Sequence, residues 1–198
     1  MAITGRSGSG KSTLLYQLGL LDHPSEGSIT VNEEVVTNLY GSKRVEFRRT
    51  FLGYIFQDYA ILPTLTAKEN VLLPMMMQGY ETDTMNQKAL ESLQKVGLEN
   101  KINSLPSQLS GGEQQRVGIA RAIAHHPSIL FADEPTANLD TESSEVVLDI
   151  FLKLNQEGQT IIMVTHEPEY AKLTDRIIEI SDGKIVSDTV LKIKSRQP

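Results

Sequence analysis

Nine consecutive residues near the start of the chain have the types and spacing that bind a phosphate chain. They follow the pattern G-x-x-x-x-G-K-[ST], in which glycines let the backbone approach a ligand closely. Successive N–H groups in such a loop point inward and form an anion-binding nest. The residues are Gly5, Arg6, Ser7, Gly8, Ser9, Gly10, Lys11, Ser12 and Thr13. We expect Lys11 to reach the terminal phosphates of a nucleotide and the Ser12 hydroxyl to ligate Mg²⁺.

A helix is expected directly after this loop, because Leu14, Leu15, Leu18 and Leu21 recur at helical spacing. The positive end of its dipole would then point at the phosphates. A glycine- and serine-rich turn that caps an ordinary helix is the alternative. The full pattern together with the following helix favours the phosphate site.

A second set of chemically active residues ends a buried strand. Residues 129–132 are apolar, and Asp133 and Glu134 follow them directly. We expect Asp133 to help hold Mg²⁺ and Glu134 to orient and deprotonate a water molecule. Two carboxylates at a strand end are also common in solvated turns, but a phosphate loop in the same chain favours the catalytic interpretation.

Two adjacent glycines open another predicted helix. Ser110 and Glu113 form a capping box, and the helix is expected to run to about residue 124. Gly111 and Gly112 weaken its first turn by about 1 kcal/mol each relative to alanine. The pattern is typical of a simple helix start or of a second helix N-terminus that binds phosphate, and the local residues leave both open.

Three further polar residues stand at the ends of strands or loops. His166 follows the strand expected at 160–165, and ligands bind at the carboxyl ends of strands in open α/β sheets. We therefore expect His166 to contact a phosphate. Gln57 follows the apolar run 51–56, and Asp140 is a candidate helix cap.

The composition is that of a chain that folds around one core. It has 198 residues, of which 39% are hydrophobic and 22% charged, and its formal net charge is −6. The acidic balance argues against a nucleic-acid partner, which would require a basic patch. The absence of cysteine excludes disulfides and zinc–thiolate sites and fits the cytosol. No apolar run reaches the roughly 18 residues of a membrane span, so a membrane role requires a partner chain.

Alternating strands and helices predict a parallel sheet flanked by helices, within a single domain at 1–198. We expect residues 1–57 and 129–198 to form its core, with a helical insert at 58–128. Other elements follow from local patterns. They are a short strand at 2–4, a strand at 28–32, a solvated loop or helix at 37–49, a hairpin at Asp182-Gly183 and a frayed tail from Lys192 to Pro198.

The insert carries its own signals. Thr66 and Glu69 form a capping box that opens a helix, and Pro74 is expected to end or kink it. The methionines at 75–77 are typical of adaptable core packing, with a contact surface for a partner as the alternative.

Taken in order, these motifs resemble the ATP-binding subunit of an ABC transporter. The segment Leu109-Ser110-Gly111-Gly112-Glu113 is more specific than the phosphate loop, and the resemblance covers essentially the whole chain. It implies a P-loop NTPase fold with a RecA-like parallel core, the cofactors ATP and Mg²⁺, and a dimer with a second ATPase subunit. It also implies a transmembrane permease partner at the inner face of the cell membrane, and no nucleic acid.

The resemblance implies a role for each matching residue. Residues 5–13 hold the phosphates, Glu134 is the general base, and His166 contacts the γ-phosphate. Gln57 senses Mg²⁺ and the attacking water and couples to the membrane subunit. The residues implied to serve the ATP of the opposite subunit are Ser110, Gly111 and Gly112, with Asp140 at the dimer seam.

The finer resemblance is to the lipoprotein-releasing and macrolide-export group. It is carried by residues 53–57, 62–71, 73–74 and 135–140. The chain departs from the family in two ways. Gly118 lies within the helix where alanine is the better helix former. Members also carry strands and an adenine-stacking aromatic before the phosphate loop, and we expect a truncation or an upstream start here.

Two other functions remain open from the sequence. One is a soluble ABC ATPase that acts on ribosomes or DNA, although such relatives usually carry two domains or a coiled-coil insertion. The other is a degenerate nucleotide-binding module that acts only as a regulatory partner.

Overall fold

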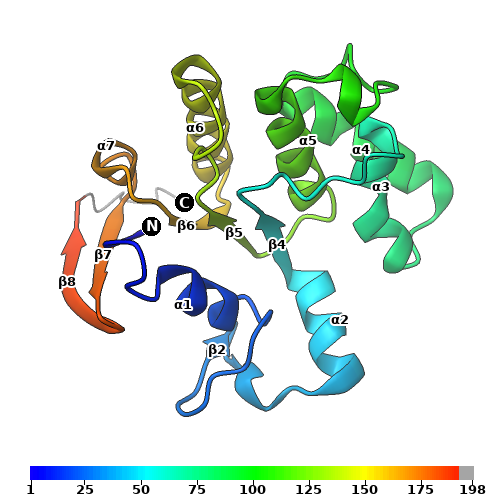
Figure 1. Ribbon diagram of the computed structural model, residues 1–198. Coiled ribbons are helices and arrows are strands. Elements are labelled where there is room, and N and C mark those ends of the chain that lie inside the picture. The colour runs from blue at the N-terminus through cyan, green and yellow to red at the C-terminus, as the bar shows by residue number, and fades with distance from the viewer. Residues whose placement is uncertain (192–198) are drawn as a thin grey trace.

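The computed structural model describes residues 1–191, along which strands alternate with helices (Figure 1). The tail predicted to fray, from Lys192 onward, lies outside the described residues. The strands are β1 (Ala2–Thr4), β2 (Thr30–Val31), β3 (Glu34–Val35), β4 (Leu52–Ile55), β5 (Ile129–Asp133), β6 (Thr160–Val164), β7 (Arg176–Ser181) and β8 (Lys184–Val190). The helices are α1 (Lys11–Leu18), α2 (Gly41–Phe51), α3 (Ala67–Met77), α4 (Thr82–Lys95), α5 (Gly111–Ile123), α6 (Thr141–Gln156) and α7 (Pro168–Ala171).

Six strands form one sheet in the order β4-β5-β6-β1-β7-β8. The first five run parallel, as predicted, and β8 pairs antiparallel with β7 in the C-terminal hairpin. The short strand β1 lies between β6 and β7, where Ala2 is opposite both Met163 and Ile177. The phosphate loop therefore emerges at the carboxyl edge of the parallel strands, where ligands bind in such sheets.

Each face of the sheet is covered by its own hydrophobic core. Along β5 the side chains alternate, so that Leu130 and Ala132 join a core with α3 to α6, and Phe131 joins a core with α1 and α2. Figure 1 shows α1 and α2 on one side of the sheet and α5 and α6 on the other. Helices on both faces explain why the parallel strands are apolar almost throughout.

The segment predicted as one strand at 28–32 is instead part of a hairpin, so that prediction was wrong in extent. β2 and β3 are two residues each and pair antiparallel. The turn residues Asn32 and Glu33 have φ of 49° and 68°. Positive φ at both central residues is the geometry of a two-residue hairpin, which the sequence signals poorly because neither residue is glycine.

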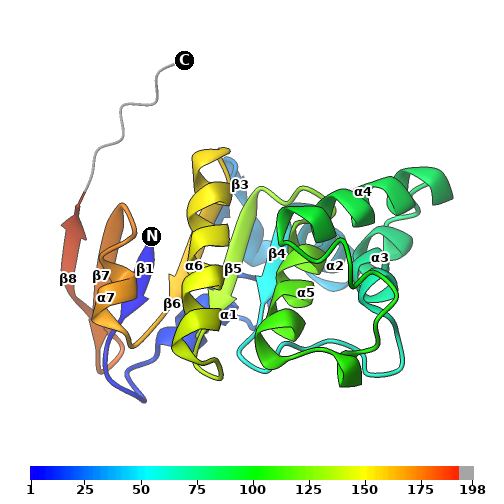
Figure 2. The same cartoon turned by 90° about the horizontal axis from the view of Figure 1, so that it is seen from above.

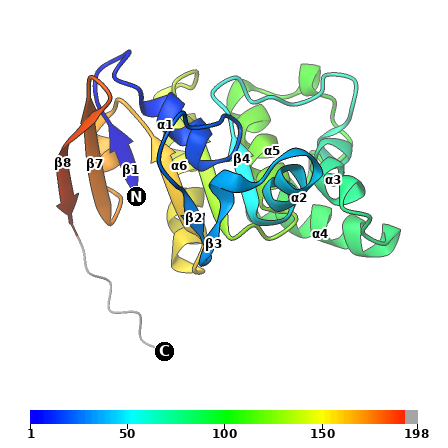
Figure 3. The ribbon, with the colours of Figure 1, turned by 90° about the horizontal axis from the view of Figure 1, so that it is seen from below.

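The three helices of the insert gather beyond β4, at the end of the sheet opposite β8 (Figures 2 and 3). The predicted capping box of α3 is present, with the Glu69 N–H donating to Thr66 Oγ1 and the Thr66 N–H to Glu69 Oε2. Pro74 does not end this helix, which continues to Met77. Met75 is fully buried, whereas Met77 is 66% exposed. None of the helices in residues 1–191 is long and apolar enough to cross a membrane.

Candidate functional site

The phosphate loop between β1 and α1 has a geometry that only glycine allows at its first position. Gly5 has a φ of 145°, and a Cβ atom there would lie 2.1 Å from the carbonyl oxygen of Ile180. Gly10, with a φ of 98°, ends the loop as the N-cap of α1. The loop is also tied to the β7–β8 turn, because the Gly183 N–H donates to Ser9 O at 3.0 Å. These contacts hold the loop open at the N-terminus of α1, where a phosphate is stabilised.

Lys11 lies folded under the same loop. Its Nζ donates to the carbonyl oxygens of Gly5 at 3.0 Å and Arg6 at 3.1 Å, and the residue is buried. Carbonyl oxygens neutralise the ammonium poorly, since they carry only partial charge. An anionic phosphate in the loop would form the stronger, charge-assisted bond with Lys11.

Asp133, at the end of β5, accepts two hydroxyl hydrogen bonds from α1. Ser12 Oγ donates to Oδ1 at 2.9 Å, and the Tyr16 hydroxyl donates to Oδ2 at 2.7 Å. Asp133 is buried. The hydrogen bond to Asp133, followed by burial, raises the pKa of Tyr16 to about 12. Tyr16 therefore stays protonated and remains a donor at neutral pH.

The Ser12–Asp133 pair fits a hard divalent cation. It offers a hydroxyl and a carboxylate oxygen, the ligand types that Mg²⁺ prefers. No lysine or arginine in residues 1–191 forms an ion pair with Asp133. Within that range no group of three His, Cys, Asp or Glu side chains could hold a metal by itself. This agrees with the habit of Mg²⁺ of binding one or two protein groups together with substrate phosphates and water.

Glu134 and His166 meet at the ends of neighbouring parallel strands. His166 Nδ1 lies 2.7 Å from Glu134 Oε2, and the Glu134 N–H donates to Val164 O at 3.1 Å. Glu134 also has a φ of 45°, an unusual conformation for a non-glycine residue. The strained backbone turns this side chain toward His166, one residue beyond the buried Asp133. The predicted base and the predicted phosphate contact are thus brought together.

Gln57 follows β4 and is exposed. Its carbonyl oxygen accepts from Asn138 Nδ2 at 3.2 Å, which ties it to the loop after Glu134. The buried Gln115 makes a similar link, donating to Pro135 O at 2.7 Å and Phe56 O at 3.4 Å. The Gln57 side chain forms no hydrogen bond with Ser12, Asp133 or Glu134 within the described residues. The contact that ties Gln57 to this region is thus made by its backbone, and the role of its side chain stays a prediction.

The capping box of α5 is present as predicted. The Glu113 N–H donates to Ser110 Oγ at 3.2 Å, and the Ser110 N–H donates to Glu113 Oε2 at 2.8 Å. The Gly111–Gly112 pair has a reason within the chain itself. A Cβ on Gly112 would lie 2.6 Å from Ser143 Oγ, and one on Gly111 would lie 2.9 Å from the Tyr59 hydroxyl. Close packing against α6 thus favours glycine at 112, whereas a side chain at 111 would only displace the end of the Tyr59 side chain.

Gly118, where alanine would be the better helix former, packs closely against the backbone at Tyr59. A Cβ at position 118 would lie 3.1 Å from Tyr59 O.

Asp140 is the N-cap of α6, as predicted, and accepts a hydrogen bond from the Ser143 N–H at 2.7 Å. This bond lowers the pKa of Asp140. Ser110 and Asp140 are exposed, and no hydrogen bond in residues 1–191 joins either one to the phosphate loop.

The sequence interpretation missed three residues that the structure adds to the site. They are Tyr16, Gln115 and Asn138. Tyr16 carries a weak signal, because it lies one helical turn after Ser12. The other two have none, since their partners are distant in the chain and are polar backbone atoms.

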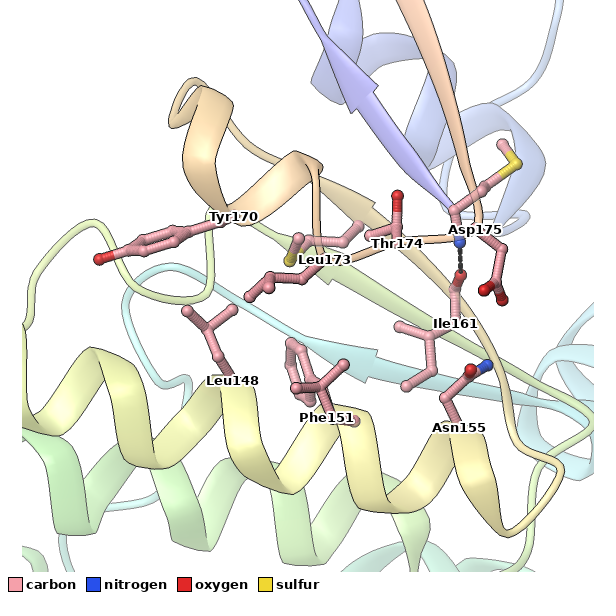
Figure 4. Close-up of a pocket in the computed structure, with 11 residues that line it drawn as sticks. Leu148, Phe151, Asn155, Ile161, Tyr170, Leu173, Thr174 and Asp175 are labelled. Carbon is pink, nitrogen blue, oxygen red and sulfur yellow. Dashed lines mark hydrogen bonds between the residues drawn. The ribbon is translucent and has the colours of Figure 1, made fainter. Parts of the chain in front are cut away.

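A separate small cavity lies between α6, β6 and the α7–β7 turn. It encloses about 50 Å³ and is lined mainly by apolar side chains. Figure 4 shows Leu148 and Phe151 pointing from α6 toward Leu173. None of the predicted site residues lines this cavity. Its lining therefore does not belong to the phosphate site.

Comparisons with known proteins decide the family. A model of the ABC transporter family matches residues 1–137. The chain belongs to the ABC transporter family. It is 48% identical to the "Lipoprotein-releasing system ATP-binding protein LolD" of Aquifex aeolicus over 95% of this chain and 84% of that protein. The macrolide export ATP-binding/permease protein MacB of Campylobacter jejuni is 47% identical over 96% of this chain but only 30% of its own length.

Solved structures of ABC cassettes also match this chain. A dimeric post-hydrolysis state of the cassette MJ0796, bound to ADP and Pi, matches with a TM-score of 0.88 and 39% identity over 96% of this chain and 84% of that one. The predicted family, the α/β fold and the assignment as an ABC-type ATPase are thereby confirmed.

Proposed function

We propose that the chain binds and hydrolyses Mg²⁺-ATP as the ATPase subunit of an export or mechanotransmission system of the LolD and MacB type. One observation carries the proposal. The phosphate loop, the Ser12–Asp133 pair and the Glu134–His166 pair all meet at the carboxyl edge of one parallel sheet. Phosphoryl transfer to water needs these three functions in one place.

The geometry supports most of the proposed residue roles, and the role of Gln57 rests on the resemblance to the family. The loop N–H groups and Lys11 bind the β- and γ-phosphates, and Ser12, Gln57 and Asp133 would hold Mg²⁺. When bound, Mg²⁺ neutralises charge on the phosphates. Glu134 accepts a proton from the attacking water, while His166 holds the Glu134 carboxylate and faces the γ-phosphate. Together these groups position the water in line with the bond that breaks.

We further propose that two copies, or one copy and a related subunit, close around ATP head to tail. Ser110, Gly111, Gly112 and Asp140 would then face the ATP held by the partner. Ser110 and Asp140 are exposed, and no hydrogen bond in residues 1–191 joins either one to the phosphate loop of the same chain. Both features support a role across the dimer interface. The α5 N-terminus offers free N–H groups to a phosphate. A similar cassette, MJ0796, has a solved dimeric structure, with a TM-score of 0.88.

The membrane-embedded partner is proposed to contact a groove between α2, β4, α3 and α5. This groove has a volume of about 380 Å³, is lined by apolar residues with three arginines, and contains no acidic residue. Phe56, next to Gln57, lies on its wall, and Met77 on its rim is 66% exposed. An acidic, partly apolar segment of a permease would fit it and would place the chain at the inner face of the membrane.

Hydrolysis tests the proposal directly. Purified chain should release phosphate from ATP only when Mg²⁺ is present, and Lys11→Ala should abolish that release. Nucleotide binding without any turnover, under conditions where a related cassette is active, would indicate a regulatory module instead.

The partner is tested separately. Tagged chain should recover a multi-span protein from detergent-solubilised membranes, and Met77→Glu should lose it. Val186→Glu is the control, because Val186 on β8 is also exposed, at 58%, but lies at the opposite end of the sheet. Recovery of ribosomes or DNA without a membrane protein would favour a soluble ABC ATPase.

A further inference from the structure

We propose that Tyr16 is a positioning residue that fixes the Asp133 carboxylate for Mg²⁺, an inference that rests on the proposed function. Ser12 and Tyr16 lie one turn apart on α1 and face the end of β5. Each donates to a different oxygen of the same carboxylate, at 2.9 Å for Ser12 and 2.7 Å for Tyr16. The two hydroxyls together fix both the rotation and the tilt of the Asp133 side chain.

The two hydroxyls would have different roles when the cation binds. A hydroxyl has one donor and two lone pairs, so a Ser12 oxygen that ligates a cation would be positioned by that cation as well as by its bond to Asp133. Tyr16 has no such second task. Its bond to Oδ2 would therefore continue to orient the carboxylate when Ser12 and Asp133 hold the cation.

The charge balance around Asp133 makes this bond important. No lysine or arginine in residues 1–191 is paired with the carboxylate, so hydroxyl donors alone compensate its buried charge. Hydroxyl donors orient an anion without cancelling its charge, and the carboxylate stays attractive to a cation. A lysine in the place of Tyr16 would compete with the metal.

Tyr16→Phe isolates the hydroxyl from the other contacts of the residue. The main-chain carbonyl of Tyr16 accepts from the N–H groups of Leu21 and Asp22 at the end of α1, and these bonds do not depend on the side chain. The ring remains, so the packing of the half-buried side chain is kept. The change removes one oxygen next to one carboxylate.

The test measures how much Mg²⁺ is needed for nucleotide binding, with no hydrolysis in the readout. A fluorescent ATP analogue is bound at fixed concentration while Mg²⁺ is titrated, and binding in EDTA is measured separately. Tyr16→Phe should raise the Mg²⁺ concentration for half-maximal binding about tenfold, the effect expected of one hydrogen bond to a charged group. Binding in EDTA should stay close to wild type, and kcat at saturating Mg²⁺ should largely recover.

Tyr80→Phe is the matched control, because Tyr80 lies between α3 and α4. Lys88 Nζ lies over its ring, 5.8 Å from the ring centroid, in a cation–π contact. This variant should leave the Mg²⁺ requirement unchanged. An unchanged Mg²⁺ requirement in Tyr16→Phe, or an equal loss of binding with and without Mg²⁺, would overturn the inference. Failure of the wild-type chain to bind Mg²⁺-ATP would count against the proposed function instead.

Discussion

At the scale of single residues, the contact between Glu134 and His166 is central to the proposed chemistry. The 2.7 Å contact holds a carboxylate at the end of β5, where we propose that the water attacks. Glu134→Gln keeps the shape of the side chain but removes its basicity. We expect nucleotide binding to persist while phosphate release falls by about 10²- to 10⁴-fold, the usual contribution of a general base.

Glu167→Gln is the control for this substitution. Glu167 Oε1 lies 3.3 Å from Nε2, the other ring nitrogen of His166. Glu167 therefore contacts the same histidine but does not follow Asp133 at the end of β5. Its turnover should stay within a few-fold of wild type. Normal phosphate release by Glu134→Gln would rule out Glu134 as the base.

Residue by residue, the sequence was informative where a motif is contiguous. The loop at 5–13 and the Asp133-Glu134 pair needed no tertiary information, because neighbours in sequence supply the whole chemical pattern. Gln115 and Asn138 could not be predicted, since each acts by bonding backbone carbonyls far away in the chain. Their amides have value only once the fold has placed those carbonyls.

At the scale of elements, two capping boxes of the same design allow a matched comparison. Thr66–Glu69 opens α3 and Ser110–Glu113 opens α5, with closely similar bonds. Thr66→Ala and Ser110→Ala should each lower the free energy of unfolding by about 1 kcal/mol, as caps do. Only Ser110→Ala should also weaken ATP-dependent dimerisation.

Urea unfolding gives the first quantity and light scattering with Mg²⁺-ATP gives the second. Equal dimerisation of the two variants would mean that the α5 cap is purely a structural feature. Both variants are compared on the Glu134→Gln background, so that ATP is not consumed during the measurement.

The packing of α5 against α6 supplies a second prediction at this scale. Gly112→Ala places a Cβ 2.6 Å from Ser143 Oγ, so α5 or α6 must shift. Overpacking of this kind typically costs about 1–3 kcal/mol of stability. Ser143→Gly in the same chain should restore part of that loss.

Thermal unfolding of the single and double variants measures the coupling. Additive effects of the two changes would contradict the close packing of Gly112. If stability is restored but dimerisation is not, Gly112 has a separate role at the seam.

Predictions of where elements begin and end were confirmed where one local sequence signal dominated. They were wrong where a tertiary contact or an unusual turn determined the structure. The capped helices α3, α5 and α6 began at the predicted residues. Pro74 was expected to end or kink α3, and it does not end the helix, which continues to Met77. The buried Met75 beyond the proline anchors that last turn in the core. The β2–β3 hairpin was missed because its turn uses Asn32 and Glu33 instead of glycine.

At the scale of the whole molecule, the order of the strands assembles the site. The alternation of strands and helices predicted a parallel sheet, but it did not predict that β1 lies between β6 and β7. That position sets the phosphate loop beside the ends of β5 and β6, where Asp133 and His166 stand. Strand order depends on crossovers that leave no local signature in sequence.

Under the proposed function, one chain is an incomplete site. The phosphate loop and the Ser110–Gly112 segment belong to different parts of the fold, and no hydrogen bond in residues 1–191 connects them. We therefore expect a second subunit to supply the missing phosphate contacts.

Size-exclusion chromatography of Glu134→Gln with and without Mg²⁺-ATP tests that claim most directly. We predict a monomer without nucleotide and a dimer with it, and we predict that adding Ser110→Arg returns the protein to a monomer while ATP still binds. A protein that binds Mg²⁺-ATP and stays monomeric, or a dimer that forms equally well with Ser110→Arg, would contradict the account.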